Sequence, residues 1–219
     1  MAFASASRDG TGWRVLIAGT GGQGVLTIAR LLCNAFVERG HEVVSGQLHG
    51  MAQRGGSVQS SVIIDGGMCP VIADGRADYV LGLEPMETAR VLSSMSAGTV
   101  TYMNTSPVVP YVLAQRAATG KEDADYPDID YLSDCVRSVT PNVLMFDATA
   151  MAVEAGSAKS LNMVMLGCFL GGGGLPCTPE DFWQVIETRM PLALQEINRR
   201  AFFCGADVGR EHRGSVEEQ

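Results

Sequence analysis

The chain has 219 residues, enough for one large domain with a sizeable apolar core. Its apolar fraction of 46% and mean hydropathy of +0.12 are typical of a folded protein and exclude a disordered one. The net charge of −8 argues against nucleic-acid binding, which needs clustered Lys and Arg. No apolar run is long enough to span a bilayer, and residues 1–13, a predicted loose leader, lack the apolar centre of a secretory signal. We therefore expect a cytoplasmic protein.

The first predicted elements alternate between strand and helix. Residues 14–18 form a short apolar run typical of a strand, and residues 22–38 place apolar side chains at helical spacing. Strands are predicted again at 42–45 and 57–65. The stretch 47–56 between them follows neither period.

The same alternation continues through the middle of the chain. Strands are predicted at 79–83, 99–103 and 143–147, and helices at 85–92 and 131–139. Prolines and a charged patch mark residues 104–126 as a loop or insertion.

The last third is predicted to be helical. Residues 161–169 are apolar throughout, and Thr178 followed by Pro179 is a typical helix start. Helices are expected at 182–189 and 192–203, and a loose polar tail at 205–219. The whole pattern predicts an α/β, Rossmann-like domain over residues 14–204, with a largely parallel sheet flanked by helices.

The six cysteines are scattered and include no C-x-x-C pair, and the three histidines are equally far apart. Iron–sulfur clusters and structural zinc sites use such pairs to direct thiolates at one centre. The sequence therefore predicts no metal site on this chain, and reduced thiols with structural roles.

A glycine-rich turn is the first candidate site. Residues 15–26 read V-L-I-A-G-T-G-G-Q-G-V-L, which predicts a strand, a tight turn and a helix. Glycines allow backbone N–H groups to gather at a helix N-terminus, whose partial positive charge favours an anion. The residues expected to hold a phosphate-bearing cofactor are Gly19, Thr20, Gly21, Gly22, Gln23 and Gly24.

The ligand of this turn is not fixed by the glycines. An NAD site needs an acid at the end of the second strand, and residues 43–46 read V-V-S-G. Glu42 lies at the wrong end of that strand, and Arg54 comes late for an NADP phosphate. The turn can instead hold another phosphate or carboxylate, or serve only for close packing of strand and helix. A free-standing NAD(P)- or nucleotide-binding protein is the alternative function.

A second set of motifs carries a family resemblance. Residues 50–58 read G-M-A-Q-R-G-G-S-V, and three later segments agree with them: A-D-Y-V-L-G-L-E-P at 77–85, D-A-T at 147–149 and N-M-V-M-L-G at 162–167. Together they resemble the gamma subunit or domain of 2-oxoacid:acceptor oxidoreductases, over residues 14–201. Within that family the chain is most similar to the small subunits of the indolepyruvate:ferredoxin branch.

The resemblance implies an oxidative decarboxylation in which a 2-oxoacid and coenzyme A give an acyl-CoA and carbon dioxide while ferredoxin is reduced. Thiamine diphosphate, magnesium and the iron–sulfur clusters belong to a large partner subunit in this family. The chain is thus expected to support assembly and to bind coenzyme A, with no catalytic residue of its own and no activity alone.

The resemblance also suggests roles for residues outside the turn. The loop at residues 49–56 is expected to reach the large subunit's active site or the coenzyme A arm. Alternatively, it is an interface loop held by an arginine–carboxylate pair. A possible cleft is expected at Glu84, Asp147 and Asn162, although the first two can equally cap helices and Asn162 can bond buried backbone. The loop residues are His49, Met51, Gln53, Arg54, Gly55 and Gly56.

Overall fold

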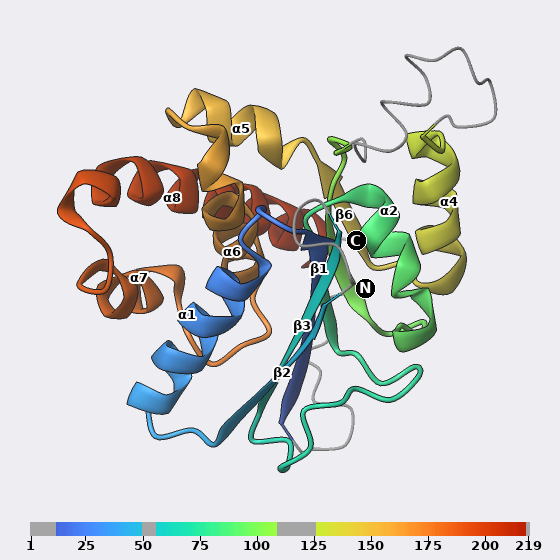
Figure 1. The fold of residues 1–219 in the computed structure, drawn as a ribbon, viewed down its shortest axis with the longest axis horizontal. Helices are drawn as coiled ribbons and strands as arrows, with labels where there is room; N and C mark the ends of the chain where they lie inside the picture. The colour runs from blue at the N-terminus through green and yellow to red at the C-terminus, as the bar shows by residue number, and fades with distance from the viewer. Residues whose placement is uncertain (1–11, 50–55, 109–125, 218–219) are drawn as a thin grey trace.

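The computed structural model describes residues 12–49, 56–108 and 126–217, which form a six-stranded sheet with helices on both faces (Figure 1). The strands are β1 (Trp13–Thr20), β2 (Val43–His49), β3 (Ser57–Ile64), β4 (Tyr79–Gly82), β5 (Val100–Asn104) and β6 (Val143–Phe146). The helices are α1 (Val25–Glu38), α2 (Pro85–Arg90), α4 (Ile129–Val139), α5 (Ala148–Glu154), α6 (Leu161–Gly171), α7 (Pro179–Glu187) and α8 (Leu192–Glu217), with 3-10 turns at η1 (Leu92–Ser94) and η2 (Ala158–Ser160).

The strand order is β2-β3-β1-β4-β5-β6. Strands β1, β4, β5 and β6 are parallel, and β3 is antiparallel to both of its neighbours, so that β2 runs in the same direction as β1. The predicted α/β fold with a largely parallel sheet is confirmed. Its order differs from the Rossmann order, in which β2 is adjacent to β1. Here β3 separates the two, which moves the end of β2 away from β1 by one further strand spacing, about 4.8 Å.

One face of the sheet is covered by α1 and α6, with α7 and α8 outside them (Figure 1). Helix α6 is buried along its whole length because it lies between the sheet and α8, as expected for a helix that is apolar all round. Its glycines allow the close approach of α8: a Cβ at Gly167 would lie 1.9 Å from the Phe202 carbonyl oxygen, and one at Gly171 would lie 2.1 Å from that of Ala206.

The other face is covered by α2 and α4 over the β4–β5–β6 half of the sheet. Buried Leu16, Val80, Met103 and Val136 form its core. Among the helices in the described ranges, none has the length and apolarity needed to cross a bilayer.

The predicted loose tail from residue 205 is wrong, because α8 continues without a break to Glu217. Gly205 and Gly209 lower the helix propensity of this segment, but packing requires them. A Cβ at Gly205 would lie 2.0 Å from a carbonyl oxygen of α6, and a Cβ at Gly209 would lie 2.2 Å from another. Contact with α6 therefore overrides local propensity. The sequence also missed α5 and ended β2 too early.

Candidate functional site

The carboxyl ends of β1, β4, β5 and β6 meet at one edge of the sheet, because these strands are parallel. Helices α1, α2 and α5 begin at this edge, following β1, β4 and β6 respectively. Ligands of open α/β sheets bind at this edge. The three helix starts therefore define where a small molecule can be held.

The glycine turn is closed by the side chain of Gln23. Its Oε1 accepts from the Thr20 N–H at 2.8 Å, and its Nε2 donates to the Leu83 carbonyl at 3.0 Å, which joins the turn to the end of β4. The Gln23 N–H in turn donates to the Thr20 carbonyl at 3.1 Å. The amide of Gln23 thus supports the turn instead of pointing outward to a ligand.

The glycines of the turn have different physical roles. A Cβ at Gly24 would lie 2.5 Å from Nδ2 and 2.9 Å from Cβ of Asn162, and one at Gly19 would lie 3.1 Å from Cβ of Leu83. These two glycines are required for packing. Gly22, like Gly24, is in the left-handed region, with φ at +106°. A Cβ at Gly22, however, would meet nothing within 4 Å. Packing therefore does not explain Gly22, which faces open space.

The start of α1 is open to a pocket of about 420 Å³, lined by Thr20, Gly22 and the first residues of the helix. Its N-cap is Gly24, which has no side chain to cap the helix, and the first turn contains no acid. The Ile28 N–H makes the first helical bond, to the Gly24 carbonyl at 3.0 Å, so the N–H groups before it precede the ladder. Uncapped N–H groups and the helix dipole favour an anion in this pocket.

Glu84 caps α2. Its side chain is 1% exposed, its Oε2 accepts from the Glu87 N–H at 2.9 Å, and its Oε1 accepts from the Tyr126 hydroxyl. Burial and the carboxylate of Glu84 raise the pKa of Tyr126, which keeps its hydroxyl protonated as a donor. The capping interpretation is the one that this geometry supports.

Asp147 has the same capping role at α5. Its Oδ1 accepts from the Ala150 N–H at 2.8 Å and from the Ser106 hydroxyl at 2.7 Å. These two donors hold the pKa of the carboxyl below its usual range, since both stabilise the charged form. The start of α5 is therefore occupied by a carboxylate of the chain itself.

The sequence did not single out Asn104, which joins the ends of three elements at this edge. Its side chain is fully buried; its Nδ2 donates to the Leu83 carbonyl at 3.0 Å and to the Thr149 hydroxyl at 3.1 Å, and its Oδ1 accepts from the Ala148 N–H at 3.0 Å. The one available signal was its position directly after an apolar strand, where buried polar groups must be hydrogen-bonded.

The second sequence motif meets the turn in space. The Gly21 N–H donates to the Gly56 carbonyl at 2.9 Å, and Ser57 pairs with Thr20 in the β1–β3 register. The backbone of His49 pairs with Val58, which lines the α1 pocket. Both ends of the predicted partner loop are thus fixed beside the glycine turn. The remaining loop residues, Met51, Gln53, Arg54 and Gly55, lie outside the described residues.

Asn162 lies in α6 with 9% of its surface exposed. One side of it contacts Gly24, and it also lines a neighbouring pocket between α1, α6 and α8. The structure thus places Asn162 next to the turn but brings neither Glu84 nor Asp147 into the same cavity.

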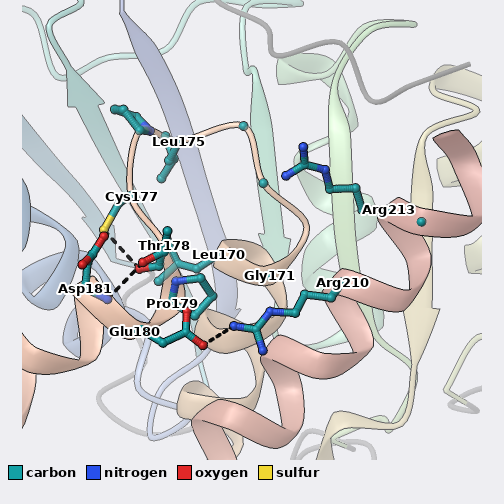
Figure 2. A pocket seen from close by; sticks show the side chains of 14 residues that line it. Leu170, Gly171, Leu175, Cys177, Thr178, Pro179, Glu180, Asp181, Arg210 and Arg213 are labelled. Atoms are coloured by element: carbon teal, nitrogen blue, oxygen red, sulfur yellow. Dashed lines mark hydrogen bonds and ion pairs between the residues drawn. The ribbon is translucent and has the colours of Figure 1, made fainter.

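A further pocket, of about 510 Å³, follows the glycine-rich end of α6 (Figure 2). Gly174 packs on the hydroxyl of Tyr79, the first residue of β4, so this pocket lies toward the amino ends of the strands. Two of its charged groups are paired with each other, since Arg210 bonds Glu180 across the pocket. Its position and its internal ion pair make it a weaker candidate than the α1 pocket.

The described residues contain no group of three or more potential metal ligands. Burial raises the pKa of Cys168, and it raises that of Cys177 to about 11, so both thiols are protonated at neutral pH. Protonated thiols are poor metal ligands and poor nucleophiles. This chemistry agrees with structural roles for these cysteines.

The fold also weakens the NAD(P) alternative. The ribose-binding acid of a dinucleotide site belongs at the end of a strand adjacent to β1, and β3 occupies that position here, running in the opposite direction. Strand β2 ends one strand further out. The fold thus has a helix start that can bind a phosphate, but it lacks a ribose-binding acid at the end of the strand next to β1.

Comparison with known proteins likewise favours an oxidoreductase subunit over a dinucleotide-binding protein. The family described as pyruvate ferredoxin/flavodoxin oxidoreductase matches residues 14–208. The chain is 33% identical over 199 residues to the indolepyruvate oxidoreductase subunit IorB of Methanothermobacter thermautotrophicus, covering 91% of this chain and 98% of that protein.

Solved structures have the same fold. The gamma subunit of a keto/oxoacid ferredoxin oxidoreductase from Geobacter sulfurreducens aligns with a TM-score of 0.64 at 23% identity, over 91% of this chain and 99% of that one. A 2-oxoglutarate:ferredoxin oxidoreductase from Magnetococcus marinus, solved with 2-oxoglutarate, coenzyme A and succinyl-CoA bound, aligns with a TM-score of 0.67 at 16% identity. That alignment covers 92% of this chain and 31% of the other.

Proposed function

Because the chain belongs to the pyruvate ferredoxin/flavodoxin oxidoreductase family, we propose that it is the small subunit of an enzyme that oxidatively decarboxylates an arylpyruvate such as indolepyruvate. The reaction converts the 2-oxoacid and coenzyme A to an acyl-CoA and carbon dioxide, and the two electrons released reduce two ferredoxins. The name of the curated relative and its near-complete coverage support this substrate class.

In this proposal the chain completes a site whose redox chemistry belongs to a large subunit. Thiamine diphosphate, magnesium and the iron–sulfur clusters are held by that partner. Coenzyme A, when bound, supplies the thiol that receives the acyl group. The loop that begins at His49 and ends at Gly56 contacts the large subunit, and its fixed end beside Gly21 supports a place for this contact next to the glycine turn.

One observation supports coenzyme A binding most strongly. Among α1, α2 and α5, which follow β1, β4 and β6 at the carboxyl edge, α2 and α5 are capped by carboxylates, while α1 has an uncapped glycine start facing a pocket of about 420 Å³. A phosphate group of coenzyme A fits that start, with Gly22, Gly24 and the first-turn N–H groups as donors. The coenzyme A reported in the Magnetococcus marinus structure agrees with this ligand class.

The test is co-expression with the large subunit and an assay of dye reduction by arylpyruvates at varied coenzyme A concentration. Gly22→Ala and Gly40→Ala form a matched pair, because both glycines have positive φ and neither has an atom within 4 Å of a new Cβ. We expect Gly22→Ala to raise the KM for coenzyme A by roughly tenfold, equivalent to ~1.4 kcal/mol of lost binding. Gly40→Ala, at the other end of α1, should leave that KM unchanged.

Two results would overturn the proposal. Absence of coenzyme A-dependent oxidation of any arylpyruvate by the purified pair would exclude the activity. Equal effects of the two glycine variants on the KM for coenzyme A would leave the activity but exclude the turn as its binding site.

A further inference from the structure

The two edges of the sheet differ in how they are protected from pairing with another chain. Strand β6, at one end of the strand order, has only four residues, and a very short strand is one way in which proteins blunt a sheet edge. Strand β2, at the other end, has seven residues and pairs with β3 in an unbroken register. Its sequence, V-V-S-G-Q-L-H, contains no proline, lysine, arginine or carboxylate. Strand β2 therefore lacks the sequence features that protect an edge.

The outer side of β2 carries backbone hydrogen-bonding groups. The Asp65 N–H donates to the Glu42 carbonyl at 2.8 Å, directly before the β2–β3 ladder begins. Hydrogen-bonded and non-hydrogen-bonded pairs alternate along an antiparallel ladder, so the backbones of Val43, Ser45 and His49 point away from β3. No strand in the described part of the chain lies on that side. The edge is thus long enough to pair with an extended segment over roughly 23 Å.

An uncharged groove adjoins this edge on the face of the sheet opposite α1. Val43 packs on the α1 side, so Leu48 faces the other way, because side chains alternate along a strand. The groove has a volume of about 200 Å³ and is lined by Leu16, Leu48 and Val71, among others. None of the described residues that line it is charged. Helices α2 and α4 cover the β4–β5–β6 half of this face and leave the groove open.

An open strand edge beside a groove is the arrangement used in β-strand addition. Main-chain hydrogen bonds to the edge provide affinity, and a groove that accepts alternate side chains provides specificity. The net charge of −8 disfavours a second copy of this chain as the partner. Strand β2 also ends at His49, where the loop that is proposed to contact the large subunit begins. Edge, groove and loop therefore lie along one continuous surface.

We propose that an extended, uncharged segment of the large subunit pairs with the outer side of β2 and inserts an apolar side chain between Leu48 and Val71. This inference rests on the proposed function, which supplies the partner. The added strand extends the sheet across the interface between the two subunits. It also explains why β2 is long and uncharged although it is an edge strand.

The first test is calorimetric titration of the full chain into the purified large subunit. Leu48→Lys and Val71→Lys place a charge in the groove and leave the backbone of β2 unchanged. Each should weaken binding by about tenfold or more, because the charge must be buried against an apolar side chain. Val37→Lys is the matched control, since Val37 is another exposed apolar residue but lies near the end of α1. It should leave the Kd unchanged.

A second pair of variants tests the strand edge itself. Ser45→Pro removes an outward N–H and keeps the hydrogen bonds to β3, as proline is tolerated at such edge positions. It should also weaken binding about tenfold. Ser45→Ala removes only the hydroxyl bonded to the Cys33 thiol and should bind normally. Circular dichroism shows whether each variant is folded, and the two lysine variants decide the question if Ser45→Pro is not.

Three results would contradict the inference. Unchanged affinity of Leu48→Lys and Val71→Lys, or equal weakening by Val37→Lys, would overturn it and leave the proposed function intact. A dimer of the chain alone in light scattering, converted to a monomer by Leu48→Lys, would assign the edge to a second copy. Failure of the unaltered chain to bind the large subunit would overturn the proposed function as well.

Discussion

At the starts of α2 and α5 a carboxylate of the chain accepts the first-turn N–H groups, whereas at the start of α1 the same position is a glycine. Glu84 and Asp147 each accept a hydrogen bond from a first-turn N–H of a helix that begins where a parallel strand ends. At Gly24 no side chain of the described residues does so, and the helix faces a pocket. Carboxylates stabilise two of these starts, while the uncapped start of α1 favours an anion.

The difference extends to the residues behind each start. Asn104 fixes the capped side by joining Leu83, Ala148 and Thr149, while Gln23 fixes the open side by joining the turn to the same Leu83 carbonyl. The start of α1 is therefore held in place although no side chain caps it. This arrangement is what a preformed anion site requires, because its donors are ordered before the ligand arrives.

The largest effect should come from Gly24→Ala. A left-handed residue with a Cβ costs about 1–2 kcal/mol, and overlap with Asn162 adds about 1–3 kcal/mol. Urea unfolding should therefore show a loss of about 3 kcal/mol in the free energy of unfolding. Gly40→Ala has the strain without the overlap and should lose about 1–2 kcal/mol. Equal losses would show that contact with Asn162 does not explain the glycine.

A smaller effect is expected from Asn104→Ala on the capped side. The substitution leaves the buried Ala148 N–H without its acceptor, and an unsatisfied buried group costs about 1–3 kcal/mol. Thermal or urea unfolding measures this loss. Asn142→Ala is the matched control, because Asn142 makes an exposed bond to the Ala97 carbonyl and should change stability by less than about 0.5 kcal/mol. Similar losses of stability in the two variants would show that the hydrogen bonds of Asn104 do not stabilise this edge.

The smallest effect should come from Asp147→Asn, which keeps a capping oxygen and removes the charge. We expect a loss of ~1 kcal/mol at pH 7. The folded pKa of Asp147 is lowered, so its stabilisation is complete above the unfolded value, near pH 4, and disappears as the pH falls through the folded value. Urea unfolding of both proteins from pH 7 to pH 3 should show the difference shrinking below about pH 4. A difference that stays constant to pH 3 would contradict the role of the charge.

The sequence alone determined the local elements and the motifs. Apolar periodicity predicted the strand, turn and helix around residues 15–38, because local spacing decides which face of an element is buried. Thr178 and Pro179 correctly marked the start of α7, since capping depends on neighbouring residues. The glycine turn and the motif at residues 50–58 were enough to identify the family, which the comparison at residues 14–208 confirmed.

Only the tertiary structure decided which residues meet. The insertion of β3 between β1 and β2, the bond from Gly21 to Gly56 and the groove shared by Leu16, Leu48 and Val71 all join segments far apart in the chain. The unbroken length of α8 likewise depended on its packing against α6. Such features arise from long-range contacts, and a local pattern contains no information about its distant partner. The sequence therefore pointed to an anion at the glycine turn, and the fold showed that α1 begins there without a side-chain cap.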